Sequence, residues 1–240
     1  MIKKKYRYFQ LSYFLRKLYS YKFLNFFLSE NFMRKKIFKH IFKSGYWLDY
    51  NTHNDESRSG KGSNFENTVQ LQSDLKVFFK DNKVKKILDI GCGDFNWMSI
   101  LLKEVDYDSY LGLDIVDSLV DYNNKKYRNK KIKFVSKDFV NDDIDFIKEF
   151  DFILIRHVFI HLKNSNINSV INKIKKINFS YLGITSDANL IKNLDLKTEG
   201  RYRDINLTIE PFCMGKPFQI LNDIDTSRAS NVDLNIYDLK

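Results

Sequence analysis

Cysteine is scarce in this chain of 240 residues. Cys92 and Cys213 are the only two, and neither belongs to a CxxC pair or to a metal-ligand spacing. This excludes a disulfide scaffold and a cysteine-based zinc site, and it favours a reducing, cytoplasmic setting. The N-terminus has lysines but no uninterrupted apolar segment, and no run approaches about 20 apolar residues. The sequence therefore predicts neither secretion nor a membrane span.

The most informative stretch is residues 86–95, with the sequence KILDIGCGDF, which joins a short apolar strand to a glycine turn. Residues 84–90 alternate too little for a strand with one wet face, and they suit a parallel strand buried on both faces. Such strands end where ligands bind in open α/β sheets. Gly91 and Gly93 let the backbone approach a ligand closely, so we expect a nucleotide-cofactor site at this turn.

A missing glycine decides which cofactor is expected. A dinucleotide fingerprint needs G-x-G-x-x-G, but Asn96 occupies the third glycine position, which argues against a nicotinamide-dependent reductase. Asp89 lies two residues before the first glycine, where its charge would repel a pyrophosphate and suit a cationic sulfonium. The stretch resembles motif I of class I S-adenosylmethionine-dependent methyltransferases. The resemblance implies S-adenosylmethionine as cofactor, with Asp89, Gly91, Cys92, Gly93 and Asp94 around it. A chance glycine pair is the alternative, and Cys92 is expected to be a small buried side chain rather than a nucleophile.

Two further strands end in acidic residues at the expected spacings. Residues 110–115 end with Asp114 and Ile115, about 25 residues after Asp89, and Asp114 is placed to hold both ribose hydroxyls. This matches the second motif of the same family. Residues 132–135 form the next strand, after which Asp138 is a candidate acceptor for the adenine amino group and Phe139 a cover for the ring. An exposed turn or cap residue remains the alternative for Asp138.

Strand patterns alternate with helical patterns along the chain, which predicts a doubly wound, mostly parallel α/β fold. Helices are expected over residues 69–79 and 167–177, and further strands over 150–155 and 181–185. The family resemblance implies a seven-stranded sheet, closed by strands from 217–222 and 232–237. We therefore predict a Rossmann-like methyltransferase domain over 49–240, preceded by a helical extension over 1–48.

The basic charge of the chain lies in that extension. Residues 1–45 contain twelve Lys and Arg and one glutamate, a net charge of +11, whereas the whole chain carries +10. Aromatic residues are interleaved with these charges, as in a basic amphipathic helix at an anionic membrane surface or partner. The alternative is a helical layer whose aromatics pack on the domain while its lysines stay in water. Nucleic-acid binding ranks third, because no known binding fold accompanies the charge.

A polar segment with two glycines separates the extension from the domain. Residues 55–64, here called the Ser-Gly segment, place Ser59 and Gly60 among backbone N–H groups that can form an anion nest. A flexible loop is the alternative. Residues 56–63 (ESRSGKGS) upstream of 89–98 (DIGCGDFNWM) resemble a bacterial methyltransferase subgroup often associated with surface-glycan gene clusters, from which Lys61 departs because that pattern has proline. The resemblance implies that Ser59, Gly60 and Trp97 contact the substrate.

Two histidines follow the fourth strand, in residues 155–162 (IRHVFIHL). His157 is the candidate general base, and His161 resembles a histidine that many small-molecule methyltransferases carry in the following helix. Four residues apart, both would lie on one face of a helix. A zinc pair is rejected because Val158 replaces the glutamate of H-E-x-x-H, so no metal is expected. A structural histidine remains the alternative for each. Arg156 is assigned to the cofactor site.

An arginine-containing stretch, residues 200–207 (GRYRDINL), is here called the arginine loop. It resembles a pattern of the same subgroup, and Arg201 and Arg203 are candidates to grip a phosphate or carboxylate through paired N–H donors. Surface arginines on a solvated turn are the alternative. The sequence thus predicts methyl transfer to an oxygen of an anionic small molecule, such as a phosphorylated or nucleotide-linked glycan precursor. An RNA methyltransferase and a non-catalytic cofactor-binding adaptor remain open, as does peripheral contact with the inner membrane face through residues 1–45.

Overall fold

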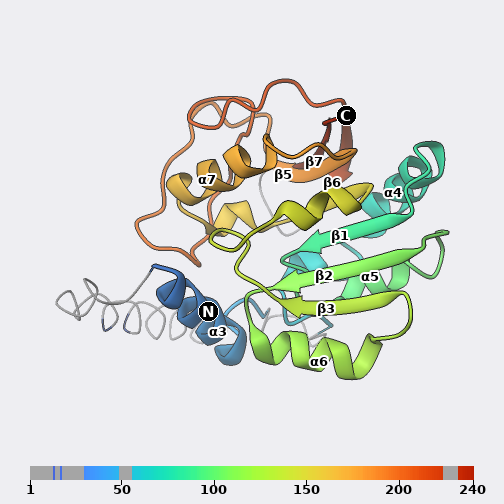
Figure 1. The fold of residues 1–240 in the computed structure, drawn as a ribbon. Helices are drawn as coiled ribbons and strands as arrows, with labels where there is room; N and C mark the ends of the chain where they lie inside the picture. Colours follow the sequence, from blue (N-terminus) through green and yellow to red (C-terminus); the bar gives the residue numbers. More distant parts are fainter. Residues whose placement is uncertain (1–12, 14–16, 18–29, 49–55, 224–231) are drawn as a thin grey trace.

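A mixed sheet of seven strands forms the centre of the computed structural model, in the order β3-β2-β1-β4-β5-β7-β6 (Figure 1). The strands are β1 Lys86–Ile90, β2 Ser109–Asp114, β3 Ile132–Ser136, β4 Phe152–Ile155, β5 Tyr181–Ser186, β6 Gln219–Asp223 and β7 Val232–Asp238. The first five run parallel, and β7 runs antiparallel to both β5 and β6. The structure describes residues 13, 17, 30–48, 56–223 and 232–240. The predicted doubly wound fold is confirmed, including its two closing strands.

Helices cover both faces of the sheet because the strand side chains are apolar on both sides. The helices are α3 Glu30–Ser44, α4 Val69–Asp81, α5 Asn96–Leu101, α6 Asp117–Tyr127 and α7 Asn164–Ile174, with short 3-10 turns η1 Lys61–Ser63, η2 Asp145–Glu149 and η3 Phe159–His161. Apolar residues of α4, α5 and α6 pack on one face, and α7 packs on the other. The helix expected over 69–79 is α4, and the one expected over 167–177 begins and ends three residues earlier, as α7.

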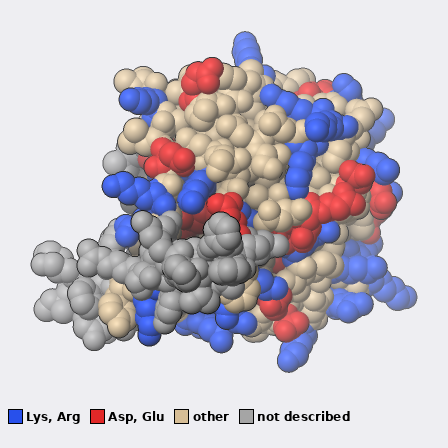
Figure 2. Space-filling view, turned by 60° about the vertical axis from the view of Figure 1, so that its left-hand side comes forward, with Lys and Arg blue, Asp and Glu red and all other residues tan. Residues whose placement is uncertain are grey.

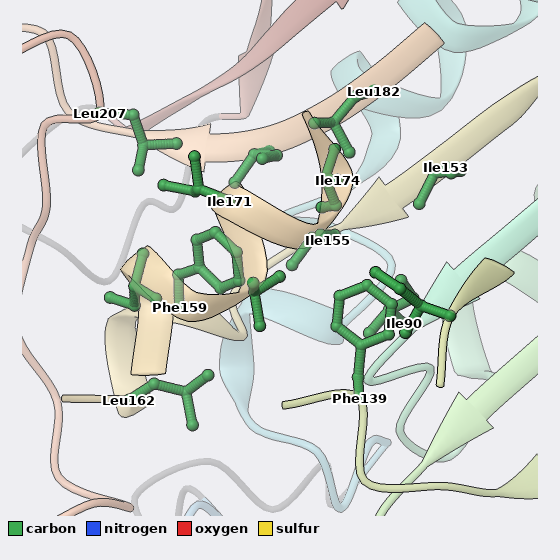
Figure 3. Close-up of a cluster of buried hydrophobic side chains, with 14 of the residues drawn as sticks. Ile90, Phe139, Ile153, Ile155, Phe159, Leu162, Ile171, Ile174, Leu182 and Leu207 are labelled. Atoms are coloured by element: carbon green, nitrogen blue, oxygen red, sulfur yellow. The ribbon is translucent and has the colours of Figure 1, made fainter. Parts of the chain in front are cut away.

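The core on the α7 face reaches the edge of the sheet where the parallel strands end. Ile155 of β4 and Phe159 of η3 lie in the same buried cluster as Ile171 and Ile174 of α7 (Figure 3). Side chains of β4 point alternately to the two faces of the sheet. Ile153 and Ile155 belong to this cluster, while Phe152 and Leu154 belong to the cluster that contains α4 and α5. The segment that follows β4 is thereby anchored by buried apolar contacts.

Helix α3 lies beside the arrowheads of β2 and β3, at the carboxyl edge of the sheet (Figure 1). Ile37 and Ile41 are buried on its inner side, whereas Lys36 and Lys43 are exposed. The rest of the predicted extension falls mostly on residues outside the described ones, so its interpretation stays a prediction. Among the described residues no helix is long and apolar enough to cross a membrane.

Candidate active site

The glycine turn after β1 is tied to the end of β2. The backbone N–H groups of Gly91 and Cys92 both donate to the carbonyl oxygen of Leu113, at 2.8 and 3.0 Å. Gly91 and Gly93 have φ angles of 75° and 57°, a region that favours glycine. A Cβ atom on Gly91 would lie 2.3 Å from Cγ2 of Val158, which follows β4. The turn is therefore packed between β2 and the segment after β4, where the strand order reverses and ligands of such sheets bind.

Asp114 stands at the end of β2 and holds this turn. Its Oδ2 accepts from the N–H of Gly93 at 3.2 Å, and its Oδ1 accepts from the N–H of Val116 at 2.9 Å. Burial raises the pKa of the Asp114 carboxyl to about 6, although these backbone donors oppose the shift. The group is thus mainly ionised at neutral pH, and a carboxylate with about four acceptor positions can still accept from a hydroxyl beside its backbone donors. Its role with the ribose, and that of half-buried Ile115, stay predictions.

Asp89 and Cys92 are more deeply buried than Asp114. Asp89 is 4% exposed and accepts a 2.7 Å hydrogen bond from the hydroxyl of Tyr110. Burial raises the pKa of the Asp89 carboxyl to about 7, while the Tyr110 hydrogen bond and the charge of Arg156 act in the opposite direction. Burial also raises the pKa of the Cys92 thiol well above its usual value, so this side chain behaves as a small apolar group.

The Ser-Gly segment is bound to the glycine turn itself. Ser57 Oγ donates to the Asp94 carboxylate at 3.0 Å, and the Arg58 N–H donates to the same group at 2.6 Å. In return, the Asp94 N–H donates to Ser59 Oγ at 2.9 Å. Asp94 and Ser59, expected to contact cofactor and substrate, therefore bind each other. A Cβ atom on Gly93 would lie 2.3 Å from Ser59 Oγ, so this contact needs a glycine there.

The same segment also contacts the start of α5. Asn96 Nδ2 donates to Oε1 of Glu56 at 2.6 Å and to the carbonyl oxygen of Ser63 at 3.0 Å. Trp97 is 6% exposed in the core, with the Arg156 guanidinium 5.2 Å from its ring centroid. Trp97 is therefore part of the core here, and its contact with the substrate stays a prediction. The two sequence motifs that carry the subgroup resemblance, residues 56–63 and 89–98, form one hydrogen-bonded unit.

Arg156 is buried and bound within the protein, and its assignment to the cofactor site stays a prediction. Its guanidinium makes two bonds to the Asp223 carboxylate, at 2.6 and 2.8 Å, and one to the carbonyl oxygen of Gly62 at 2.7 Å. Burial disfavours ionisation of Asp223, but the charges of Arg156 and His157 outweigh it and hold the pKa of that carboxyl well below its usual range. Arg156 thus joins β4, β6 and the Ser-Gly segment.

The spacing of the two candidate histidines predicted that they share one face of a helix, but in the structure they do not. His157 has a φ of 57°, outside any helix, and its N–H donates to Thr185 Oγ1 at 2.9 Å. Its Nε2 lies 3.4 Å from Oδ2 of Asp223. His161 ends the 3-10 turn η3 and points to a different set of partners. The left-handed backbone at His157 is incompatible with a right-handed helix, so a helical spacing does not apply.

His161 lies in an aromatic cluster. Its ring stacks on Trp47 with centroids 4.7 Å apart, and Tyr202 of the arginine loop meets it edge-on at 6.4 Å. Nδ1 of His161 lies 3.0 Å from the carbonyl oxygen of Arg201. Gly60 of the Ser-Gly segment packs against Trp47, with its ideal Cβ position 3.6 Å from Trp47 Cβ. The structure therefore brings together Gly60, His161 and the arginine loop, three of the expected elements.

The two arginines of the arginine loop have different surroundings. Arg203 donates from Nε to the carbonyl oxygen of Leu194 at 2.7 Å and from Nη2 to Oδ1 of Asn164 at 2.6 Å, and Nη1 lies 3.3 Å from two carbonyl oxygens of η3. Burial lowers the pKa of Arg203. Its donors are bound by protein groups, and the expectation that it grips a substrate anion stays a prediction. Arg201 is exposed and keeps that expectation.

Asp138 follows β3 and is bound by a residue that sequence reasoning did not select. Arg34 of α3 donates from Nη1 to its Oδ2 at 2.7 Å and from Nε to Glu199 Oε2 at 2.9 Å. Phe139 is buried in the core beside Ile90 (Figure 3). The amphipathic spacing of Arg34, Ile37 and Ile41 was a signal for one buried helix face. Asp223, which also escaped notice, had no local signal.

The residues present fit S-adenosylmethionine. The glycine turn excludes a Cβ at Gly91, Asp114 has acceptor positions beside the turn, and a buried donor, Nη2 of Arg34, has no hydrogen-bond partner among the described residues. His, Cys, Asp and Glu side chains of the described residues form no group that could hold a metal ion.

Comparisons with known proteins agree with this fold. Residues 87–178 match the family model for a methyltransferase domain. The fold resembles magnesium protoporphyrin IX methyltransferase (ChlM) from Synechocystis PCC 6803 with bound SAM, at a TM-score of 0.59 and 12% identity over 89% of this chain and 99% of that one. It also resembles the N-methyltransferase NodS from Bradyrhizobium japonicum WM9, with a TM-score of 0.51 and 12% sequence identity. That match covers 74% of this chain and 98% of NodS. A third similar structure is the methyltransferase domain of bacterial CtHen1-CN, with a TM-score of 0.53 and 16% sequence identity. That match covers 71% of this chain and 98% of the other. No curated protein matches the sequence. Residues 87–178 therefore match a methyltransferase domain, and the fold of the chain is that of methyltransferases such as the S-adenosylmethionine-bound ChlM.

Proposed function

We propose that this chain is an S-adenosylmethionine-dependent methyltransferase that acts on an oxygen atom of an anionic small molecule, such as a phosphorylated or nucleotide-linked glycan precursor. The observation that carries the proposal is the cluster of Trp47, His161 and Tyr202, with the exposed Arg201 beside it. Aromatic faces suit the apolar C–H surface of a sugar ring, and an arginine binds phosphate through paired N–H donors. The subgroup resemblance of the Ser-Gly segment and the arginine loop supports the glycan class.

The bound cofactor supplies an electrophilic methyl group on its sulfonium. For a hydroxyl acceptor, the chain's own residues must position the oxygen and take its proton, and a general base contributes about 10²–10⁴-fold. Because a carbonyl oxygen only accepts, the Arg201 carbonyl assigns the proton of His161 to Nδ1 and leaves Nε2 as the basic nitrogen. His157 faces the buried Asp223 instead. The geometry therefore favours His161 as the base over His157, the first choice from sequence.

The test is direct detection of a methylated product. Purified protein and methyl-labelled S-adenosylmethionine are added to the small-molecule fraction of a cell extract, and mass spectrometry follows compounds that gain one labelled methyl group. We expect His161→Ala to lower turnover by about 10²-fold or more. A chain that binds S-adenosylhomocysteine but methylates nothing would instead favour the adaptor.

Cofactor binding is tested separately at Asp114. Asp114→Ala removes both acceptor oxygens from the end of β2, so S-adenosylhomocysteine should bind about 10- to 100-fold more weakly in calorimetric titration, the range for hydrogen bonds to a charged group. Cys213→Ser, at an exposed position, serves as the control and should bind as the wild type does. Unchanged affinity in Asp114→Ala would remove this residue from the cofactor site.

RNA is the second candidate substrate, and the observation that favours it is the net charge of +11 in residues 1–45. On the face shown in Figure 2, however, Lys and Arg side chains of the described residues are interspersed with Asp and Glu. An RNA substrate predicts affinity that falls steeply with salt concentration. Peripheral binding at the inner membrane face, by contrast, predicts binding to vesicles that contain anionic lipid and none to neutral vesicles.

A further inference from the structure

Two aliphatic side chains in the segment after β5 project into water. Ile191 is 95% exposed and Leu194 is 65% exposed, the two highest fractions among the large apolar side chains of the described residues. Residues 190–194, which contain both, are here called the apolar tip. A single exposed apolar side chain is ordinary on a protein surface, so the question is whether the fold holds these two outward.

Hydrogen bonds fix the backbone of the apolar tip. Asn193 donates from Nδ2 to the carbonyl oxygen of Asn206 at 2.8 Å, and its Oδ1 accepts from the Asn206 N–H at 2.8 Å. Asn206 is buried and donates from Nδ2 to the carbonyl oxygen of Leu190 at 2.9 Å. The carbonyl oxygen of Leu194 accepts from Nε of Arg203 at 2.7 Å. The tip is therefore held at both ends and in its middle, with its two aliphatic side chains pointing away from the core.

Polar residues separate the two aliphatic side chains. Lys192 and Asn193 lie between them in the sequence, and the exposed Asp195 follows. A stable protein interface buries about 800 Å² on each partner around an apolar centre. A bilayer interface needs only apolar side chains that project beyond their polar neighbours. The tip therefore suits a lipid surface better than a folded protein partner.

Basic side chains accompany the tip. Lys192 within it and Arg201 of the arginine loop are both exposed. The nearest acidic residue in the sequence is Asp195, whose Oδ1 accepts from the backbone N–H groups of Asn164 and Leu196 at 2.8 and 2.7 Å. Anionic lipid headgroups attract lysine and arginine side chains that lie near the membrane surface. The charge around the tip thus favours an anionic bilayer.

The basic extension joins the fold next to the same segment. Ile37 and Ile41 of α3 pack against Gly200, where the arginine loop begins. Residues 1–29, which precede α3 in the chain, contain seven Lys and Arg and no Asp or Glu. Lasting attachment to a membrane takes two signals, such as apolar insertion and a polybasic stretch. The tip offers the first signal, and the sequence before α3 offers the second.

We propose that the apolar tip docks on an anionic lipid bilayer, with Ile191 and Leu194 inserted among the headgroups and with Lys192 and Arg201 bound to lipid phosphates. The extension contributes long-range attraction, and the tip contributes the contact with lipid. This docking does not depend on the acceptor of the methyl group, so it can be measured without knowledge of the reaction.

Sedimentation with lipid vesicles tests the contribution of the tip. The full chain is mixed with vesicles of phosphatidylcholine alone or of phosphatidylcholine and phosphatidylglycerol in equal parts, and it should bind the mixed vesicles more tightly. Ile191→Ser combined with Leu194→Ser should weaken that binding at least about tenfold, because two aliphatic side chains no longer leave water. Equal binding by this double variant and the wild type would overturn the proposal.

The matched control is Val77→Ser combined with Ile220→Ser. These two side chains are 59% and 51% exposed, and they lie on α4 and on the edge strand β6, outside the tip and the arginine loop. The control should bind mixed vesicles as the wild type does, and both double variants should keep the wild-type melting temperature. Equal weakening by the two double variants would mean that general surface hydrophobicity, and not the tip, sets the binding.

A fluorophore at position 191 reports insertion directly. Ile191→Cys is labelled with an environment-sensitive dye in a Cys213→Ser background, since Cys213 is exposed and Cys92 is buried. Its emission should shift to the blue on mixed vesicles, whereas the same dye on Val77→Cys should not shift. Vesicle binding without a shift at position 191 would assign the membrane contact to the extension alone and refute the proposal. A concentration-dependent dimer that is lost in the double variant of the tip would assign the tip to a second copy of the chain instead.

Discussion

At the scale of single residues, Asp89 should make the free energy of unfolding depend on pH. Its folded pKa of about 7 lies above the reference value of 3.8, so the folded protein binds more protons than the unfolded chain between these values. The free energy of unfolding should therefore fall as pH rises through this window. Relative to Asp89→Asn, ligand-free wild type should lose on the order of 2 kcal/mol between pH 5 and pH 8 in urea denaturation. A constant difference between the two proteins would show that Asp89 ionises normally.

Arg201 and Arg203, two residues apart, should separate substrate binding from stability. Arg203→Met removes donors to carbonyl oxygens of η3 and Leu194 and should cost about 2–3 kcal/mol, a decrease of about 5–10 °C in the melting temperature. Arg201→Met changes an exposed side chain, so its melting temperature should stay within about 1 °C while the KM for an anionic acceptor rises. The reverse pattern would assign the anion to Arg203.

Which residues could be predicted follows from the range of their interactions. Asp114 and the two glycines could be selected from the sequence because strand, turn and acidic residue lie in one local pattern. The hydrogen-bond partners of Arg156, Arg203 and Asp94 could not be predicted, because they are distant in the sequence. Asp223, for example, lies 67 residues after Arg156. No local pattern distinguishes a buried arginine that holds the protein together from one that holds a ligand.

At the scale of elements, Arg156 fixes how β4, β6 and the Ser-Gly segment fit together. Arg156→Met would leave the Asp223 carboxylate buried without its main partner, so we expect a loss of about 3–5 kcal/mol in the free energy of unfolding. The double variant with Asp223→Asn should recover more than half of that loss. Denaturant unfolding of the two single variants and the double variant measures this coupling, and additive losses would mean that the two side chains act independently.

Gly200 sets how closely α3 approaches the arginine loop. Its φ is 79°, and a Cβ atom there would lie 2.5 Å from Cδ1 of Ile41 and 2.7 Å from Cγ2 of Ile37. Gly200→Ala should therefore displace α3, lower stability by about 1–3 kcal/mol and weaken S-adenosylhomocysteine binding. Gly215→Ala is the control, because nothing lies within 4 Å of its ideal Cβ position and its φ of 82° imposes a similar backbone strain. Equal effects of the two variants would mean that strain alone is responsible.

The elements themselves were predicted well because each depends on local periodicity. The seven strands fall within two residues of their expected limits at each end, and the weak strand at 217–222 was recognisable through the family resemblance. The helical interpretation of residues 157–161 failed for a physical reason. His157 adopts a positive φ, which a non-glycine residue takes up only where tertiary contacts hold it, and here Thr185 binds its N–H.

At the scale of the whole molecule, the carboxyl edge of the sheet is joined to two parts that are far apart in the chain. The strand ends provide the glycine turn, Asp114 and Asp138, α3 provides Arg34, and Glu199 and Gly200 lie where the arginine loop begins. Arg34 bridges all three with one side chain. Occupation of the site should therefore stabilise α3 and the arginine loop together, although neither belongs to the sheet.

Hydrogen exchange measured with and without S-adenosylhomocysteine tests this coupling. At a ligand concentration of about 100 times Kd, binding stabilises the bound state by about 2.7 kcal/mol, which slows exchange by up to about 100-fold in segments that must open for the ligand to leave. We expect that slowing in residues 30–44 and 199–203, and little change in β6 and β7, which lie at the far edge of the sheet. In Arg34→Lys the slowing of residues 30–44 should shrink, because α3 then loses its paired hydrogen bonds to both carboxylates. Unchanged exchange of α3 in the wild type would place this helix outside the cofactor site.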